Sequence, residues 1–203
     1  MSLKHTQTEL PGVILIEPDV YKDNRGYFME TYHREKYASI GIEGVFVQDN
    51  HSHSILGTIR GLHYQLKKPQ GKLVYVIKGE IFDVSVDIRR GSPTFGVWAG
   101  VNLSEENNRQ VFVPRGFAHG FSVLSETADV IYKCTDVYSS GDEYGVLWSD
   151  PDIRIDWQID TPKLSEKDCR NPNLNTIPAD LLPIYNETPP GKTGGYRESI
   201  LNN

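Results

Sequence analysis

The sequence has few cysteines, no long hydrophobic run near its start and no excess of positive charge. Two cysteines in 203 residues cannot form a disulfide framework, and reduced thiols in a cytoplasmic protein are expected. The longest apolar run near the N-terminus, Val13 to Ile16, is too short for a signal sequence or a membrane helix. The net charge of −6 does not fit a nucleic-acid-binding surface. We therefore expect neither a membrane nor a nucleic acid as partner.

Helix signals are also few, whereas 18 glycines and 12 prolines separate many short segments. Only residues 34–40, which end before Gly41, and a short turn over residues 166–170 with Ser165 as its cap are predicted to be helical. Strands are predicted at residues 13–17, 27–32, 45–50, 73–77, 81–88, 96–102, 109–113, 120–123, 130–136 and 146–147. Short strands with regular turn signals predict an antiparallel sandwich or barrel.

The segment 81–88 has the clearest alternation. Its apolar face and its polar face are formed, in turn, by Phe82, Val84, Val86 and Ile88 and by Asp83, Ser85 and Asp87. This pattern predicts a strand buried on one face only. The preceding Lys78, Gly79 and Glu80 are expected to form a hairpin turn from the strand at 73–77.

The composition changes from about Asn171 onward, where five prolines precede a glycine-rich stretch. We therefore expect one domain over residues 1–170 and a C-terminal tail over residues 171–203 that packs on a surface or stays mobile. The sequence predicts no chemistry in this tail.

His63 lies between Leu62 and Tyr64, ten residues before a strongly apolar strand, and three interpretations are open. As a metal ligand it lacks a second histidine nearby, because Tyr64 and Gln65 are poor ligands for Zn²⁺ or Fe²⁺. As a structural histidine it would be a packed or surface residue. As a base it would act beside Arg60 and Lys72, two cations that a core would not gather without an anion to bind.

Tyr132 alternates in phase with Val130 and Cys134, so it is expected to face inward. An inward tyrosine is often a core residue with a hydrogen-bonded hydroxyl. Together with His63 it would instead form an acid and base pair.

Several motifs occur in one order: RGYFMETY, FVQDNHS, IRGLHYQ, PQGKLVYVIKGEIFDVSVDIRRGSPTFG, VPRGFAHGFSVLSE, YKCTDVY and LSEKD. They cover roughly Leu10 to Asp168, and the sequence resembles the dTDP-4-dehydrorhamnose 3,5-epimerase family. The resemblance implies an all-β, cupin-type jelly roll with a few short helices, a homodimer, and no metal or other cofactor. It also implies a dTDP-sugar substrate, whose carbons 3 and 5 are inverted next to a ketone at carbon 4.

The resemblance also implies roles for four residues. His63 would be the base, Asp168 would hold its other ring nitrogen, Lys72 would stabilise the enolate oxygen and Tyr132 would donate a proton on the opposite face. The residues that match substrate-binding positions are Arg25, Glu30, Gln48, Asp49, Asn50, Arg60, His119, Tyr138, Glu143 and Lys167. Among them Tyr138 would stack on thymine, and the arginines would grip the diphosphate.

Two other functions stay open at this point. Relatives with the same residues invert only carbon 3 or only carbon 5 of a related dTDP-4-keto-6-deoxysugar. A non-catalytic cupin that binds a sugar nucleotide is the alternative from a different class, and the presence of all four proposed catalytic residues argues against it. Both faces of the strand at residues 27–32 carry aromatic residues, which predicts burial on both sides. A partner subunit would cover one side, or the C-terminal tail would cover it within one subunit.

Overall fold

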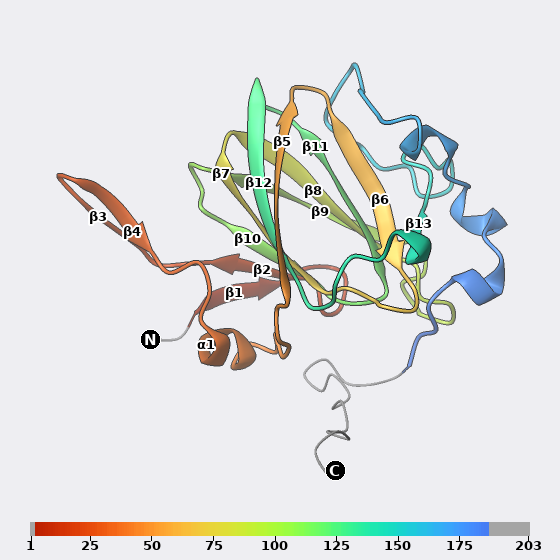
Figure 1. Ribbon diagram of the computed structural model, residues 1–203, viewed down its shortest axis with the longest axis horizontal. Helices are drawn as coiled ribbons and strands as arrows, with labels where there is room; N and C mark the ends of the chain where they lie inside the picture. The colour runs from red at the N-terminus through yellow and green to blue at the C-terminus, as the bar shows by residue number, and fades with distance from the viewer. Residues whose placement is uncertain (1–2, 187–203) are drawn as a thin grey trace, which may run out of the picture.

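The computed structural model describes residues 3–186 and consists mainly of two antiparallel sheets packed face to face (Figure 1). The larger sheet has the order β1-β2-β10-β7-β12-β5. Its strands are β1 (Lys4–Gln7), β2 (Ile14–Glu17), β10 (Gln110–Val113), β7 (Lys72–Lys78), β12 (Thr127–Cys134) and β5 (Gln48–Ile55). The smaller sheet has the order β13-β6-β11-β8-β9. Its strands are β13 (Glu143–Gly145), β6 (Ile59–Gln65), β11 (Phe117–Val123), β8 (Glu80–Asp87) and β9 (Trp98–Ser104).

The remaining elements are short. Strands β3 (Val20–Asp23) and β4 (Gly26–Met29) form a separate hairpin, and α1 spans Arg34–Ala38. Four 3-10 turns follow later in the chain: η1 (Ser140–Asp142), η2 (Asp168–Arg170), η3 (Leu174–Thr176) and η4 (Ala179–Leu181). The predicted all-β class with few short helices is confirmed. No helix among residues 3–186 is long and apolar enough to cross a membrane.

Apolar side chains form three clusters that define the layers. One fills the space between the two sheets, with Val74, Val130 and Phe121 among its members. A second packs α1 against the outer face of the larger sheet around Tyr37. The third lies on the outer face of the smaller sheet, where residues 146–182 cover strands β6, β8 and β11.

Strand β8 is buried on both faces, so the prediction of a half-buried strand is wrong. Its apolar face is covered by the C-terminal segment, in which Leu174, Ile177 and Leu182 are buried. Its polar face points between the sheets, and Asp83, for example, is only 1% exposed. The alternation is real, but the polar residues face the space between the two sheets rather than the outer surface of the protein.

The turn at Gly79 does not close a hairpin either. Strand β7 pairs with β10 and β12, whereas β8 pairs with β9 and β11 in the other sheet. The tight turn, with Gly79 at φ 78°, therefore carries the chain from one sheet to the other. Local turn chemistry was recognised correctly, but it does not determine which strands pair.

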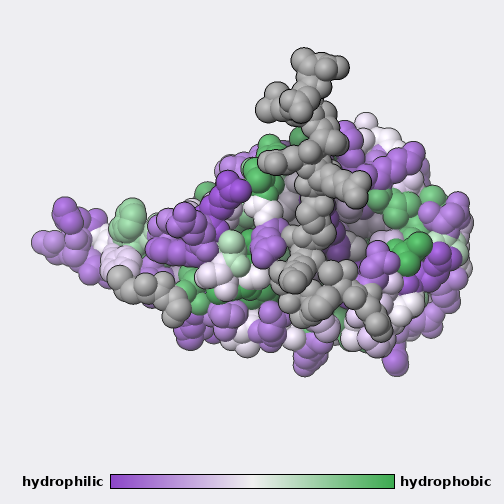
Figure 2. All heavy atoms as spheres, turned by 90° about the horizontal axis from the view of Figure 1, so that it is seen from below, coloured by the Kyte–Doolittle hydropathy of each residue, from purple (hydrophilic) through white to green (hydrophobic). Residues whose placement is uncertain are grey.

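The β3-β4 hairpin projects from the body as an arm (Figure 1), and Figure 2 shows the same arm from below with hydrophilic and hydrophobic residues at its surface. Its large side chains are strongly exposed in the single chain: Tyr21 by 55%, Tyr27 by 60% and Phe28 by 70%. The chain itself thus leaves uncovered the aromatic faces that the sequence predicts to be buried.

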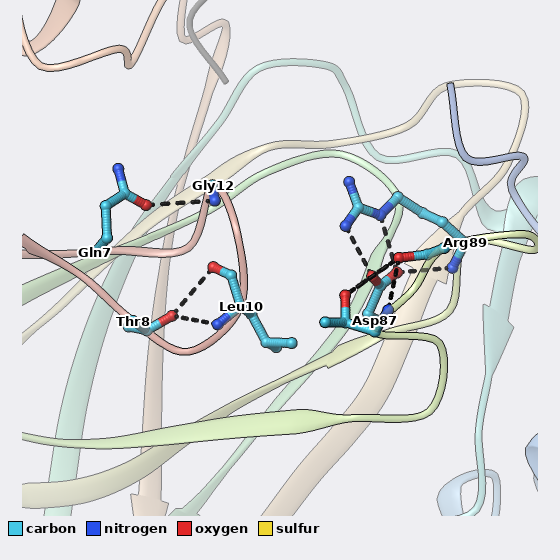
Figure 3. A network of polar contacts seen from close by, with 8 residues as sticks. Gln7, Thr8, Leu10, Gly12, Asp87 and Arg89 are labelled. Carbon is cyan, nitrogen blue, oxygen red and sulfur yellow. Dashed lines mark hydrogen bonds and ion pairs between the residues drawn. The ribbon is translucent and has the colours of Figure 1, made fainter. Parts of the chain in front are cut away.

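Residues 183–185 are fastened to the end of β8. Arg89 binds Asp87 with two nitrogens at 2.9 and 2.7 Å (Figure 3), and its guanidinium lies over the rings of Phe117 and Tyr185. Backbone bonds join Arg90 to Pro183 and to Tyr185. Residues 171–186 thus pack on the body. Residues 187–203 of the predicted tail lie outside the described residues. The domain boundary at residue 170 stays a prediction.

Candidate active site

A cavity of about 560 Å³ opens between the two sheets and is large enough for a nucleotide-sugar fragment. Its lining residues come from β5, β6, β7, β11, β12, β13 and the segment 163–168. They are Ser52, Ile55, Thr58, Ile59, Arg60, His63, Lys72, His119, Phe121, Tyr132, Glu143, Lys163, Leu164, Ser165, Lys167 and Asp168. All four residues predicted to be catalytic therefore line one cavity, together with four of the predicted binding residues.

His63 and Asp168 are 105 residues apart in sequence but form a direct pair. His63 Nε2 donates to Asp168 Oδ1 at 2.6 Å, which is the contact that the resemblance implies. The His63 side chain is 27% exposed and Asp168 is 6% exposed, so the carboxylate is the buried partner. Because Nε2 carries the proton that Asp168 accepts, Nδ1 keeps its lone pair.

Asp168 is stabilised as a carboxylate. Burial alone would raise its pKa, but hydrogen bonds from the His63 ring, the Ser165 hydroxyl and the Gly61 backbone N–H hold the pKa below its ordinary value. The side chain therefore stays charged at neutral pH and acts only as an acceptor toward His63. A charged acceptor fixes the ring tautomer more firmly than a neutral one would.

A second histidine and carboxylate pair faces His63 across strands β6 and β11. His119 is paired with His63 in the sheet register, and its Nε2 lies 3.0 and 2.9 Å from the two carboxylate oxygens of Asp83. Both side chains are buried, at 8% and 1% exposure. The two strands approach so closely here that a Cβ on Gly61 would lie only 2.5 Å from the Gly120 Cα.

Tyr132 and Lys72 reach the cavity from the opposite sheet. Burial raises the pKa of the Tyr132 hydroxyl, which keeps it a protonated donor at neutral pH. Burial also lowers the pKa of the Lys72 ammonium, against the opposing influence of Cys134, Asp83 and Glu143. A lysine and a phenol thus face His63 from the other wall.

The rim of the cavity carries a small polar cluster. Glu143 Oε2 accepts from the Tyr138 hydroxyl at 3.0 Å and also contacts the Lys167 ammonium. On the other side Arg60 donates from Nε to Ser54 Oγ at 2.9 Å. Tyr138 does not line the cavity itself but stands at its edge, 52% exposed.

Five predicted binding residues lie away from this cavity in the single chain. Arg25 is at the turn of the arm, paired with Asp23 at 2.6 Å, and Glu30 is paired with Lys36 at 2.8 Å. The other three are Gln48, Asp49 and Asn50 on the edge strand β5. Gln48 binds the Tyr138 backbone N–H and Asn50, while Asp49 pairs with Lys133.

Sequence reasoning did not identify Asp83 as the partner of His119. Asp83 begins the polar face of the alternating segment 81–88, and alternation alone fits a solvent-facing side as well as a cavity-facing one. It also missed Lys163, whose backbone pairs with Gly57 and Ile59 and so brings residues 163–168 to the cavity. No group of three or more His, Cys, Asp or Glu among the described residues could hold a metal ion.

Comparison with known proteins yields consistent matches. Residues 7–176 match the family model described as dTDP-4-dehydrorhamnose 3,5-epimerase. The protein of that name from Methanothermobacter thermautotrophicus is 55% identical over 88% of this chain and 96% of its own. The crystal structure of dTDP-6-deoxy-D-glucose-3,5-epimerase from Legionella pneumophila, in complex with dTDP-4-keto-L-rhamnose, is 50% identical with a TM-score of 0.89 over 91% of this chain and 99% of its own.

A more distant structure has a narrower activity. A 3′-monoepimerase from Streptomyces bikiniensis in complex with dTDP-quinovose is 34% identical, with a TM-score of 0.82 over 88% of this chain and 92% of its own.

Proposed function

The chain belongs to the dTDP-4-dehydrorhamnose 3,5-epimerase family, and we propose that it converts dTDP-4-dehydro-6-deoxy-D-glucose to dTDP-4-dehydro-L-rhamnose. The observation that carries this proposal is the His63–Asp168 pair facing Tyr132 and Lys72 in one cavity. The reaction needs a base on one face of the sugar ring and an acid on the other, and these two walls supply that arrangement.

The first step removes a proton from a carbon beside the ketone. Such a proton is acidic because the resulting carbanion is an enolate. His63 takes the proton on Nδ1, since Nε2 is occupied by the bond to Asp168. The imidazolium that forms is stabilised by the Asp168 carboxylate, which remains charged throughout.

The second step places a proton on the opposite face. Lys72 lines the same cavity, and its ammonium group would stabilise the enolate oxygen where negative charge develops. Tyr132 donates its phenolic proton to the carbanion, and its burial favours the neutral form that this step requires. His119, held by Asp83, lines the same cavity.

We assign the diphosphate and nucleotide to the cavity rim. Arg60 and Lys167 supply positive charge for the phosphates, and Tyr138 offers an exposed ring for the thymine base. Glu143 holds Tyr138 and Lys167 together. Gln48, Asp49 and Asn50 would contact the nucleotide or sugar from the neighbouring edge strand.

We also infer a homodimer in which the β3-β4 arm reaches the partner subunit. The arm exposes Tyr27 and Phe28 in the single chain, although aromatic side chains on a two-stranded hairpin are stabilised by burial. Arg25 and Glu30 lie on or beside this arm and do not line the cavity of their own chain. An arm that packs on the partner would bring them toward the partner's cavity.

A cytoplasmic location is our further proposal, supported by the two free cysteines, of which Cys169 is exposed. Cell fractionation tests it: enzyme found outside the cytoplasmic fraction would contradict it.

The test of the function compares His63→Ala with His5→Ala. His5 is an exposed histidine on β1 whose ring bonds only the Leu3 carbonyl, so its loss is a matched control. The wild type and His5→Ala are expected to convert the keto-sugar nucleotide, whereas His63→Ala should lose nearly all conversion. Wild-type conversion by His63→Ala would remove His63 from the mechanism, and no conversion by the wild type would refute the function itself.

A further inference from the structure

Asp168 reaches His63 from a segment without regular strands or long helices. Residue 163 begins this segment, where Lys163 donates its backbone N–H to Gly57 O at 2.8 Å and accepts from Ile59 N at 2.9 Å. These two bonds lay the chain beside the start of β6, the strand that carries His63. Five residues later Asp168 begins the short turn η2. The side chain of Asp168 must therefore be oriented by local contacts.

Ser165 provides such a contact. Its Oγ accepts the backbone N–H of Asp168 at 3.1 Å, and Ser165 itself lies two residues before Lys167, the N-cap of η2. A bond from a serine to the backbone three residues later is also one half of the capping box formed by Ser-x-x-Glu or similar sequences. In the usual box the acidic residue three positions later bonds back to the backbone of the serine. Here the Asp168 carboxylate is turned to His63 Nε2 instead. Ser165 thus holds the acid by its backbone, while Oδ1 of the carboxylate receives the histidine.

The Ser165 hydroxyl also supports the charge of Asp168. Its hydrogen bond is one of those that keep the pKa of Asp168 below its ordinary value, after the larger opposing effect of burial and the contribution of His63. Ser165 lines the cavity as well, so a direct contact with substrate is the competing interpretation. The two roles lead to different results when Asp168 is changed.

We propose that Ser165 is a positioning residue for the epimerisation, whose hydroxyl fixes Asp168 so that Oδ1 receives the Nε2–H of His63. This inference rests on the proposed function, because the pair it orients is the proposed base. Ser165 acts through Asp168 and contributes no binding to the nucleotide. Its removal should therefore lower kcat and leave KM and the affinity for dTDP unchanged.

The expected loss of kcat in Ser165→Ala is about tenfold, the effect of one hydrogen bond to a charged group. Ser165→Thr keeps a hydroxyl at the same position and should restore most of the rate. Thr176→Ala is the matched control, because Thr176 Oγ1 also closes a 3-10 turn, by bonding the Asn173 carbonyl at 2.8 Å, but lies outside the cavity. It should change kcat by less than twofold.

The decisive experiment is a double-mutant cycle with Asp168→Asn. If Ser165 acts through Asp168, adding Ser165→Ala to Asp168→Asn should lower kcat no further. A second tenfold loss in the double variant, a tenfold weaker affinity for dTDP in Ser165→Ala, or an unchanged kcat in that variant would each overturn the proposal.

Ring ¹⁵N NMR of His63 in the free protein supplies a readout that does not depend on activity. The wild type and Ser165→Thr should hold the Nε2-protonated tautomer, and Ser165→Ala should lose part of that population to the Nδ1-protonated form. An identical tautomer population in all three proteins would contradict the positioning role. Because this measurement needs no substrate, it separates a failure of this inference from a failure of the proposed function.

Discussion

Gly61→Ala should strongly destabilise the protein, because Gly61 sits where β6 and β11 touch. Its φ is 130°, and a Cβ at this position would lie 2.5 Å from the Gly120 Cα and 2.9 Å from the His119 carbonyl oxygen. All of these neighbours are backbone atoms, which cannot turn aside as a flexible side chain could. The backbone strain costs about 1–3 kcal/mol, and the forced separation of the strands adds about 1–3 kcal/mol.

The sum is about 4 kcal/mol, which for a chain of this size corresponds to a decrease in Tm of roughly 8–16 °C. Thermal unfolding followed by circular dichroism measures it. Gly26→Ala is the control, because Gly26 has nearly the same φ, 131°, but no heavy atom within 4 Å of an added Cβ. It should therefore show the strain alone and a clearly smaller shift. Equal shifts in the two variants would refute the argument that close strand contact holds His63 opposite His119.

Four further outcomes are expected. Tyr132→Phe should retain solvent deuterium exchange better than net inversion, measured on the same sample by NMR, because abstraction precedes donation; equal losses would argue against a donor role. Dialysis against EDTA should leave the turnover rate intact, and a loss that a stoichiometric divalent ion restores would contradict the metal-free mechanism. Asp142→Asn should lower the free energy of unfolding by about 1–3 kcal/mol, since burial alone would raise the pKa of Asp142 but the backbone N–H groups of residues 66–68 hold it below its ordinary value. The pKa of Asp142 is lower in the folded than in the unfolded protein. Urea titrations should therefore show the full difference in unfolding free energy between wild type and Asp142→Asn above about pH 5, and a shrinking difference below about pH 4. A difference that does not depend on pH would refute this assignment. Light scattering at dilute concentration should give about twice the 23.0 kDa chain mass, whereas a monomer with full activity would rule out an obligate dimer.

The sequence was sufficient to predict the fold class and most strands of the core. Alternation located β8, β10 and β12 within a few residues, because each carries a continuous apolar face. Strand β6, which carries His63, was not predicted, since Arg60, Gly61 and His63 interrupt its pattern. The sequence pattern of a strand reflects which side chains are buried. In β6, Arg60 and His63 line the cavity instead of packing in an apolar core, so the apolar pattern is broken.

The site was partly predictable from the resemblance to a known family. The resemblance supplied His63, Lys72, Tyr132 and Asp168, and all four line one cavity. Asp83 was not found because alternation alone does not distinguish a solvent-facing side from a cavity-facing side. Residues 25–30 lie on or beside the projecting β3-β4 arm, whose aromatic side chains are exposed in the single chain, and no local pattern in the sequence specifies where this arm points.

The most direct test of the proposed epimerisation is proton NMR of the keto-sugar nucleotide incubated with the protein in D₂O. We expect deuterium to enter both position 3 and position 5 and the L-rhamno product to accumulate, because one base and one acid on opposite walls serve both carbons. Exchange at a single position would identify a monoepimerase, like the more distant structural relative. No exchange at either position would contradict the assignment of His63 and Asp168 as the proton-abstracting pair.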